Sequence, residues 1–395
     1  ATVELTPGEY FKRVKSSHPE KEQPRPEDGG DNATGLPRKS GTPSPQCQSF
    51  TSQYISNVWK DGIFANKVVF CTGGAGTICS GQVRALVHLG ANACIIGRNV
   101  EKTERAAKDI ATVRAGAKVI GIGAVDVRKY DSLKDAADRC VKELGAIDFV
   151  IAGAAGNFLA SIEQLSVNAF KSVMDIDVLG SYNTLKATLP HLVASGTKHR
   201  IDSDSLEPSP IGTGGRIIFV SATLHYRGTP FQAHVGVAKA GIDALSNSIA
   251  IEYGPRGVTS NIIAPGPIAQ TEGLERLLPS DTKADYINSQ PLGRIGHVRD
   301  IADATVYLFS DSGSYVTGQT LVVDGANWRT SSGSGTGNLK YPDFLLSGKR
   351  LPTLLEKRSR SFEGDEIETN LASSSFFSDI FFTLDLNILA RIVPM

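Results

Sequence analysis

Seven short apolar runs, separated by stretches long enough for a helix, constrain the fold of this chain more than any other feature of its 395 residues. The runs are rich in β-branched residues and are apolar at successive positions, so both faces of each predicted strand are expected to be buried. Such strands occur in parallel sheets whose connecting helices cover both sides. The sequence therefore predicts one parallel α/β sheet, with strands at 67–71, 93–96, 119–123, 149–152, 216–221, 259–264 and 320–323.

Three segments outside this pattern have compositions that do not support a packed core. We expect most of residues 1–64 to form a disordered arm, because 17–49 combine proline, glycine and charge with few large apolar residues. Residues 194–215 carry Ser, Gly, Pro and Asp between two periodic stretches, which indicates a surface insertion. A Ser/Gly-rich stretch opens a C-terminal extension, 331–395, that we expect to be poorly ordered. The remaining 65–330 have the size of one domain.

The charge balance argues against partners that recognise a strong overall electrostatic field. The chain has 41 Lys and Arg against 41 Asp and Glu, so we expect no nucleic-acid partner. Its five cysteines include no Cys-x-x-Cys pair, and their odd number argues for reduced thiols and against a metal site. No uncharged apolar run approaches the roughly 18 to 20 residues of a membrane helix. We therefore expect no stable membrane insertion.

A glycine-rich turn follows the first predicted strand and precedes a helical pattern. Glycines at such a turn let the backbone approach a pyrophosphate, whose charge the helix N-terminus stabilises. A glycine-rich tract alone also makes tight turns, but its place after the first strand of an α/β pattern favours a dinucleotide site. The predicted fold is a single Rossmann-type, doubly wound parallel sheet with helices on both faces. The candidate phosphate-binding residues are Gly73, Gly74, Ala75, Gly76, Thr77 and Ile78.

The second predicted strand is followed by Arg98, where many NAD enzymes place an acid that holds the ribose 2′-hydroxyl. A guanidinium matches a 2′-phosphate bidentately, so NADPH is the favoured cofactor. The alternative is a solvated arginine. Asp126, after the third strand, is predicted to face the adenine, although acids at such positions also cap the following helix.

Five ordered motifs resemble the short-chain dehydrogenase/reductase family: the turn at 72–79, the tract at 152–156, Ser221, Lys239 and the tract at 265–268. The resemblance covers residues 65–329 and implies a homo-oligomer, with a tetramer as the family's usual state. Thr77 and Cys79 stand where the family has glycines, and we expect these compact side chains to be tolerated. The resemblance adds to the cofactor site Pro265, Gly266, Pro267, Ile268 and Thr271.

The predicted catalytic helix lacks the tyrosine that the family carries four residues before its lysine. Lys239 is present, but Val235 occupies the tyrosine position. Alcohol-forming chemistry, with a phenol as proton donor to a carbonyl, therefore has no donor in place. His234 lies at the wrong helical angle, so we interpret it as a packed or solvent-facing side chain. Tyr226 reaches the site only if the loop after Ser221 folds inward.

Further tracts resemble one branch of the family, the 2,4-dienoyl-CoA reductases, especially those of fungi. They include 155–158, 168–171, 174–177 and 271–274. The resemblance implies NADPH-dependent reduction of a 2,4-dienoyl-CoA to a 3-enoyl-CoA, an auxiliary step in β-oxidation of unsaturated fatty acids in peroxisomes. The chain as given ends at Met395 without the Ser-Lys-Leu-type tripeptide that addresses proteins to that organelle.

The resemblance also implies roles for particular side chains. Asp177 and Asp324 would hold the water that protonates a dienolate, Lys239 would bind the nicotinamide ribose, and Asn157 would orient the intermediate. Each acid also has an alternative role without catalysis. Asp177 could be a buried acid bound by backbone donors, and Asp324 could be a turn residue. The predicted acyl-CoA contacts are Arg128, Phe158, Ser166, Asn168 and Arg276, with surface placement as the alternative for Ser166 and Asn168.

Two other functions remain open at this stage. A carbonyl reductase, such as a 3-oxoacyl reductase, would use Tyr226 as its proton donor. A catalytically silent NADPH-binding protein would bind cofactor without turnover. Reduction of a dienoyl thioester is favoured over both, because the chain has Asp177 and Asp324 and lacks the tyrosine.

Overall fold

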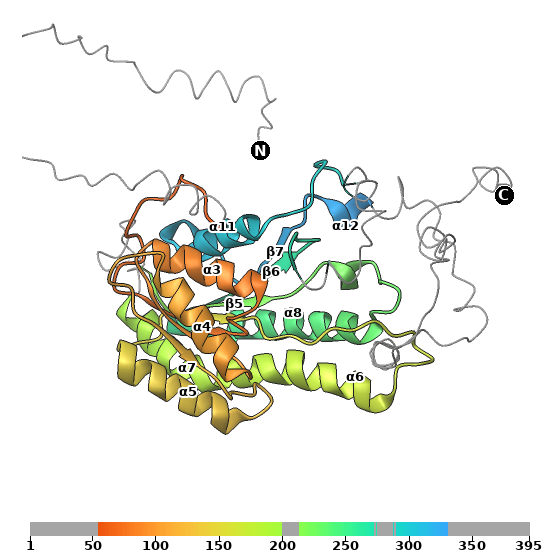
Figure 1. Cartoon of the computed structure of the whole chain (residues 1–395), viewed down its shortest axis with the longest axis horizontal. Helices are drawn as coiled ribbons and strands as arrows, with labels where there is room; N and C mark the ends of the chain where they lie inside the picture. Colours follow the sequence, from red (N-terminus) through yellow and green to blue (C-terminus); the bar gives the residue numbers. More distant parts are fainter. Residues whose placement is uncertain (1–53, 200–212, 272–273, 275–286, 288–289, 331–395) are drawn as a thin grey trace, which may run out of the picture. The chain divides into compact units, whose positions relative to one another are not determined.

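The structure is a computed structural model, and it describes residues 54–199, 213–271, 274, 287 and 290–330. At its centre is a seven-stranded parallel sheet with the strand order β3-β2-β1-β4-β5-β6-β7 (Figure 1). The predicted strands are therefore confirmed, with ends that differ by one residue. Their bounds are β1 Val68–Thr72, β2 Asn92–Ile96, β3 Val119–Ile122, β4 Phe149–Ala152, β5 Arg216–Val220, β6 Thr259–Pro265 and β7 Thr320–Val323.

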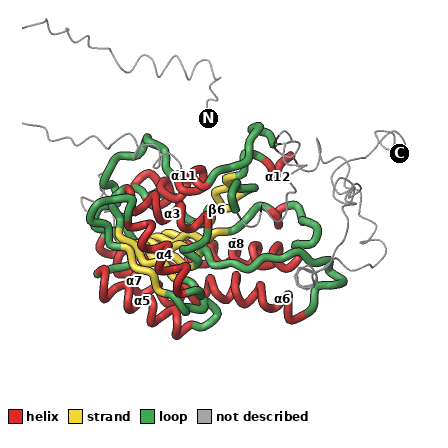
Figure 2. The backbone as a smooth tube through the Cα atoms, in the orientation of Figure 1, coloured by secondary structure: helices red, strands yellow, loops and turns green. Residues whose placement is uncertain are grey.

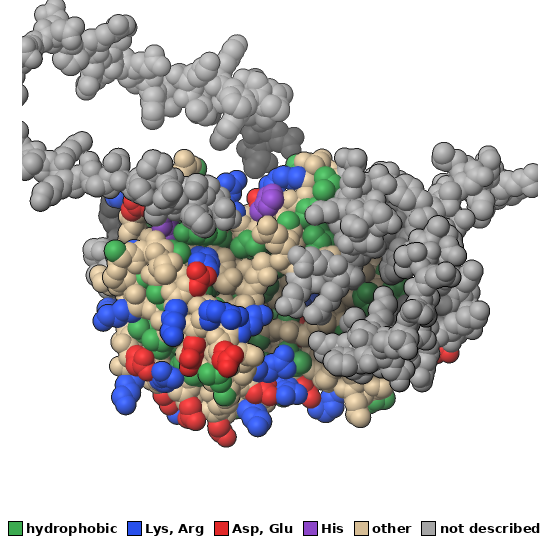
Figure 3. All heavy atoms as spheres, viewed as in Figure 1, with side chains coloured by type: hydrophobic (Ala, Val, Ile, Leu, Met, Phe, Trp, Pro, Cys, Tyr) green, Lys and Arg blue, Asp and Glu red, His purple; other side chains and the backbone are tan. Residues whose placement is uncertain are grey.

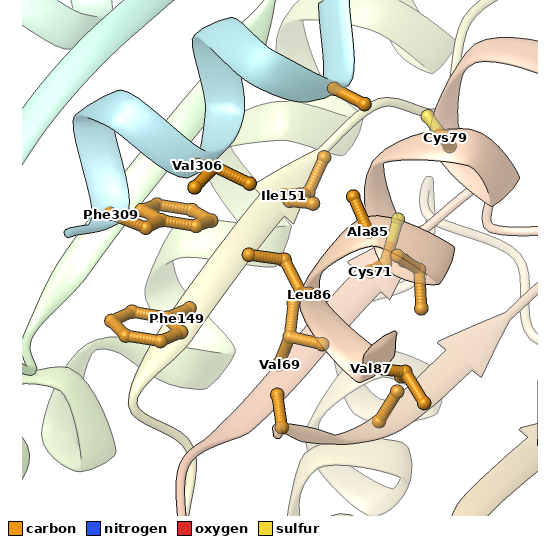
Figure 4. Close-up of a cluster of buried hydrophobic side chains, with 14 of the residues drawn as sticks. Val69, Cys71, Cys79, Ala85, Leu86, Val87, Phe149, Ile151, Val306 and Phe309 are labelled. Carbon is orange, nitrogen blue, oxygen red and sulfur yellow. The ribbon is translucent and has the colours of Figure 1, made fainter. Parts of the chain in front are cut away.

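Alternate residues of each strand enter two separate cores, as the pleat of a sheet requires. On β1, Val69 and Cys71 pack against one set of helices, whereas Val68 and Phe70 pack against the other. Figure 4 shows part of the first core, in which Leu86 lies beside Val69 and Phe309 stacks on Phe149 of the sheet. Because both faces are buried, both are apolar, which is why the strands read as continuous hydrophobic runs.

The helices form two layers, one on each face of the sheet, seen in Figure 2 as red helices flanking the yellow strands. One layer contains α3 (Thr77–His88), α4 (Val100–Ala111) and α11 (Val298–Phe309), which contribute to the first core. The other contains α5 (Tyr130–Leu144), α7 (Gly180–Lys198) and α8 (Ala233–Tyr253), which contribute to the second. The predicted doubly wound α/β fold is confirmed. The remaining described elements are α6 (Val167–Val173), η1 (Met174–Leu179), η2 (Leu224–Tyr226), η3 (Gly254–Arg256), η4 (Asp311–Gly313) and α12 (Asn327–Thr330).

The order of the strands places a ligand crevice at their carboxyl ends. The chain runs outward from β1 to β3 and then returns to β4, so β1 lies between β2 and β4. The connections on either side of β1 and β4 therefore leave in opposite directions. Open α/β sheets bind their ligands at this switch point.

The predicted boundaries differ from the packing at two places. Residues 54–64 were assigned to the arm, but Phe64 is buried and Trp59 Nε1 donates to Asp303 of α11 at 2.7 Å. The predicted insertion at 194–215 is narrower at both ends, because α7 continues to Lys198 and Thr213 is buried. Gly196 signalled a loop in the sequence, yet it lies in α7.

Close packing against another segment of backbone explains why a glycine occurs at position 196 of α7. A Cβ on Gly196 would lie 2.5 Å from the Gly257 carbonyl oxygen, so the helix needs a residue without a side chain there. The rest of the arm, residues 200–212 of the insertion and the extension at 331–395 lie outside the described residues.

Candidate active site

The turn between β1 and α3 lies against the turn that follows β4. The Thr72 hydroxyl accepts hydrogen bonds from the Gly153 and Ala154 amides, at 3.1 and 3.3 Å. Gly73 has a φ of 67°, and a Cβ there would lie 3.0 Å from the Ala154 Cα. Glycine meets both requirements, a positive φ and a close backbone approach. The two turns thus form one wall of the crevice.

The N-terminus of α3 opens toward this crevice with bare backbone. Its N-cap is Gly76, and no side chain caps the helix. The N–H groups of a first helical turn lack partners within the helix and carry a partial positive charge. A backbone that glycine leaves uncovered, ending in such a helix, fits a pyrophosphate. All six residues predicted for phosphate binding lie in this turn or in the first turn of α3.

The two departures from the glycine pattern are accommodated. Cys79 is 5% exposed, and its Sγ lies 3.8 Å from the Gly153 carbonyl oxygen. A Cβ on Gly153 would collide with that sulfur, so the glycine makes room for the thiol. Thr77 begins α3, and its carbonyl accepts the Ser80 hydroxyl at 3.1 Å.

The adenosine end of the crevice contains two arginines and one acid. Arg98, after β2, is exposed and makes no hydrogen bond or ion pair within the described part of the chain. Asp126 binds Arg128 through both carboxylate oxygens, with Nη2 at 2.6 Å from Oδ2. This hydrogen bonding lowers the pKa of Asp126, and the charge of Arg98 lowers it further. The residues predicted to face adenine and acyl-CoA are therefore paired with each other.

A buried ion pair lies beyond the carboxyl ends of β4 and β5. Asp177 is completely buried, and its Oδ1 accepts the Gly156 amide at 2.7 Å. The Lys239 ammonium lies 3.1 Å from Oδ2 and donates to the Val220 carbonyl at 3.2 Å. Its approach to Oδ2 is not aligned as a hydrogen bond, so this buried oxygen keeps an unfilled acceptor position within the described residues. Such an atom fits a hydroxyl or water in the site.

The local helix geometry explains where Asp177 points. It lies on η1, a π-helical turn between α6 and α7. The wider winding of a π turn rotates the side chains that follow, and such turns are frequent at functional sites. Here the carboxylate is directed to Gly156, beyond the end of β4, and to Lys239 on α8.

The position that lacks the tyrosine is filled by an apolar cluster. Val235 is 2% exposed and packs with Val173 and Ala238. No proton donor occupies this point. Directly after β5, the Ser221 hydroxyl is buried and makes no hydrogen bond within the described residues.

Tyr226 does not take the place of the missing donor. Its hydroxyl donates to Asp243 Oδ2 at 3.4 Å, and His225 Nε2 donates to the same oxygen at 2.8 Å. Its ring packs 5.3 Å from the Trp328 ring. Burial, followed by the charge of Asp243, raises the pKa of Tyr226 to about 12. The Tyr226 phenol is therefore hydrogen-bonded to an acid on α8.

Asp324 follows β7 and closes the turn into α12. Its Oδ1 accepts the Ala326 amide at 2.9 Å, and its Oδ2 accepts the Trp328 amide at 2.8 Å. No hydrogen bond or ion pair joins it to Asp177 within the described residues. Both acids lie beyond carboxyl ends of strands, but the turn-residue role considered for Asp324 is the one the contacts show.

The segment after β6 forms the opposite wall. Gly266 donates its amide to Val323 at 3.0 Å, and a Cβ on Gly266 would lie 2.5 Å from the Asp324 Cβ. Ile268 is buried, and its carbonyl accepts the Thr271 hydroxyl at 2.8 Å. The predicted cofactor residues from Pro265 to Thr271 therefore lie beside the turn of Asp324.

The residues predicted to contact the acyl-CoA differ in their exposure and in their hydrogen-bond partners. Asn157 and Phe158 are exposed in the loop after β4, and Asn168 is exposed on α6. Ser166 is exposed, as the surface alternative expects, and it caps α6 by accepting the Ala169 amide at 3.1 Å. Arg276 lies outside the described residues.

The sequence interpretation missed one contact of the site. His234 is completely buried, as the packed interpretation expects, but its Nε2 lies 3.0 Å from the Phe158 carbonyl oxygen. Helical spacing gave no signal, because His234 is five positions before Lys239 and lies on another face of α8. Only the folded loop brings Phe158 to it.

Positive and negative side chains are mixed on the described surface. Lys and Arg side chains lie among Asp and Glu side chains on the face shown in Figure 3. On α5, Lys134 pairs with Asp138 and Arg139 pairs with Glu143. Across the described ranges, no cluster of three His, Cys, Asp or Glu side chains has the geometry of a metal site. None of the helices in the part of the chain that the structure describes is long and apolar enough to cross a membrane.

Comparison with known proteins gives independent evidence of the family to which the chain belongs. A family model described as Enoyl-(Acyl carrier protein) reductase matches residues 73–326. The peroxisomal 2,4-dienoyl-CoA reductase of Saccharomyces cerevisiae, (3E)-enoyl-CoA-producing, is 50% identical over 289 residues, which cover 73% of this chain and 92% of that protein. The enzyme of the same name from Danio rerio is 38% identical over 278 residues, covering 70% and 86%.

Solved structures agree with this relationship. A short-chain type dehydrogenase/reductase from Mycobacterium ulcerans is 27% identical, with a TM-score of 0.60 over 68% of this chain and 94% of that chain. A short chain dehydrogenase from Bacillus anthracis is 30% identical, with a TM-score of 0.57 over 68% and 98%. The glycine turn, the lysine on α8 and these similarities lead to one assignment: the chain belongs to the short-chain dehydrogenase/reductase family.

Proposed function

We propose that this chain is an NADPH-dependent 2,4-dienoyl-CoA reductase that produces 3-enoyl-CoA and serves β-oxidation of unsaturated fatty acids. The observation that carries the proposal is the buried pair of Asp177 and Lys239 beside an apolar Val235. This site offers an acid and an ammonium but no phenol. The relatives from yeast and zebrafish, both named as peroxisomal 2,4-dienoyl-CoA reductases, support the same activity.

A nicotinamide cofactor suits the family and the crevice. One solved relative of this fold is named as a complex with NADH. For this chain we infer NADPH, because Arg98 is exposed and unpaired within the described residues while Asp126 is already bound to Arg128. A free guanidinium at the end of β2 suits a 2′-phosphate. The bound nicotinamide would supply the hydride.

The side chains of the site suit the second half of the reaction. Hydride addition at the far carbon of the diene moves electrons toward the thioester carbonyl and leaves a dienolate. That intermediate then needs a proton on the carbon next to the carbonyl, and no carbonyl oxygen has to be protonated to an alcohol. In the proposed reaction a water held by Asp177 and Asp324 delivers this proton. The unfilled acceptor position on Asp177 Oδ2 supports that role.

The remaining roles follow from position. Lys239 would bind the nicotinamide ribose while its ammonium stays beside Asp177 Oδ2, 3.1 Å away. Asn157 and Phe158, exposed beside the Gly156 contact, would meet the acyl thioester. Arg128 could reach a CoA phosphate by exchanging its partner Asp126.

Location and assembly are part of the proposal. A peroxisomal location is supported by the names of the relatives. A homo-oligomer, with the tetramer usual for the family, is supported by an apolar groove between η1, α7 and α8. This groove has a volume of about 560 Å³ and exposes Leu179 and Tyr182.

One experiment tests the activity directly. Loss of NADPH absorbance is followed with a 2,4-dienoyl-CoA and, in parallel, with a 3-oxoacyl-CoA. We expect turnover of the dienoyl thioester and a 3-enoyl product by mass and NMR spectroscopy. Turnover of the oxo thioester alone would indicate a carbonyl reductase, and cofactor binding without turnover of either would indicate a silent binding protein.

A further inference from the structure

The loop that follows β4 is held by residues far from it in the sequence. The Gly156 amide is bound by Asp177 on η1, and the Ala160 amide donates to the Phe231 carbonyl at 3.1 Å. Between these two points the exposed Phe158 is bound by His234 on α8. The proposed function leaves the contact between Phe158 and His234 without a role.

The hydrogen bond determines the tautomer of His234. The Phe158 carbonyl oxygen can only accept, so His234 Nε2 carries the hydrogen and donates it across 3.0 Å. Burial lowers the pKa of His234, which favours the neutral ring. The side chain therefore acts as a neutral donor to the loop.

The two rings are stacked as well as bonded. Their centroids are 4.2 Å apart and their planes differ by 25°. Phe158 is 36% exposed, whereas His234 is completely buried. One face of the phenyl ring is thus supported by the imidazole, and the residue keeps part of its surface exposed. A supported aromatic face is suited to the planar conjugated part of an acyl thioester.

We propose that His234 is a positioning residue that holds Phe158, by the carbonyl hydrogen bond and the ring stack, as the platform for the unsaturated acyl group. This inference rests on the proposed function. His234 does not touch the reacting atoms in this role. It acts on the affinity for the acyl-CoA through Phe158, and the cofactor is bound by other residues.

The test compares His234→Ala, His234→Gln and Phe158→Ala. The hydrogen bond and the stack together predict that His234→Ala raises the KM for the dienoyl-CoA by about tenfold, with the NADPH dissociation constant unchanged. His234→Gln keeps a donor near Phe158 and should recover part of that loss. His225→Gln is the matched control, because His225 is a mostly buried histidine that binds Asp243 and not this loop.

A double-mutant cycle separates positioning from general stability. If His234 acts through Phe158, the double variant should raise KM no further than Phe158→Ala alone. Additive effects, an unchanged KM in both single variants or an equal loss of NADPH affinity would overturn the inference. Phe158 is exposed, so its alanine variant keeps the test usable if His234→Ala does not fold. A wild-type protein that binds NADPH but does not reduce the dienoyl-CoA would instead refute the proposed function, and this inference with it.

Discussion

The Lys239 ammonium lies 3.1 Å from Oδ2 of Asp177, and both side chains are buried. The pair joins α8 to the π turn η1 and, through the Gly156 amide, to the loop after β4. A buried charge costs several kcal/mol unless a partner compensates it, so each of the two residues depends on the other. The same contact thus fixes the position of the Asp177 carboxylate between these three segments.

Replacing Asp177 by Asn should separate its chemical role from its structural one. The amide keeps an acceptor for Gly156 but loses the charge, so the turnover number should fall by at least about a hundredfold, with NADPH still bound. Steady-state rates and a fluorescence titration of NADPH measure the two effects. Asp243→Asn, the control, alters another partly buried acid on α8 that binds His225. An active Asp177→Asn variant would remove the acid from the mechanism.

Asp324 should show two separable effects. Asp324→Ala loses both acceptors of the turn and should reduce the free energy of unfolding by about 1 to 2 kcal/mol, in addition to slowing turnover about a hundredfold. Asp324→Asn retains one acceptor, so more of the stability should remain while turnover stays low. Urea unfolding and steady-state rates provide the readouts. If the Asn variant is as active as wild type, Asp324 only holds the turn.

Cofactor preference should depend on Arg98. A bidentate charged contact to the 2′-phosphate contributes about 1.5 to 3 kcal/mol, so Arg98→Asp should raise the KM for NADPH more than about tenfold and narrow its advantage over NADH. Arg105→Asp makes the same charge change at an exposed position of α4 and serves as the control. An equal effect in both variants would point to general electrostatics rather than to a specific contact.

Tyr226→Phe should change turnover by less than about threefold. The hydroxyl binds Asp243, and a pKa of about 12 keeps it protonated, while the ring that packs on Trp328 is retained. Rates with both thioesters measure the effect. Complete loss of activity would assign the proton to this phenol and favour the carbonyl reductase.

Stability should fall as the pH drops below about 6.5. Burial lowers the pKa of His191, His199 and His234 from 6.5, so the unfolded chain binds protons more readily than the folded one. The contribution is complete above the unfolded pKa and is lost as the pH falls toward the folded values. His199 Nε2 lies 2.5 Å from Lys67 Nζ, where a second positive charge is unfavourable.

Urea unfolding between pH 8 and pH 5 measures this dependence. We expect His199→Gln to reduce the slope of the unfolding free energy with pH, since the glutamine does not titrate. A slope that is the same in the variant and in the wild type would exclude His199 as a contributor.

Local patterns in the sequence predicted most of the fold. The seven apolar runs predicted the strands because a strand buried on both faces must be apolar at successive positions. Gly73 marked the phosphate turn because its positive φ and close backbone contacts disfavour a side chain there. The same reasoning wrongly predicted a loop at Gly196, because a glycine in a helix and one in a loop are alike in sequence.

The partners of the buried acid were decided only by the tertiary structure. Asp126 binds Arg128 two residues away and Asp324 binds two amides of its own turn, whereas Asp177 binds Lys239, which is distant in sequence. A carboxylate accepts equally well from an amide, a guanidinium or an ammonium, so its residue type does not select among them. The strand order and the π turn bring Gly156 and Lys239 within reach of Asp177, and that placement makes Asp177 the buried acid of the site.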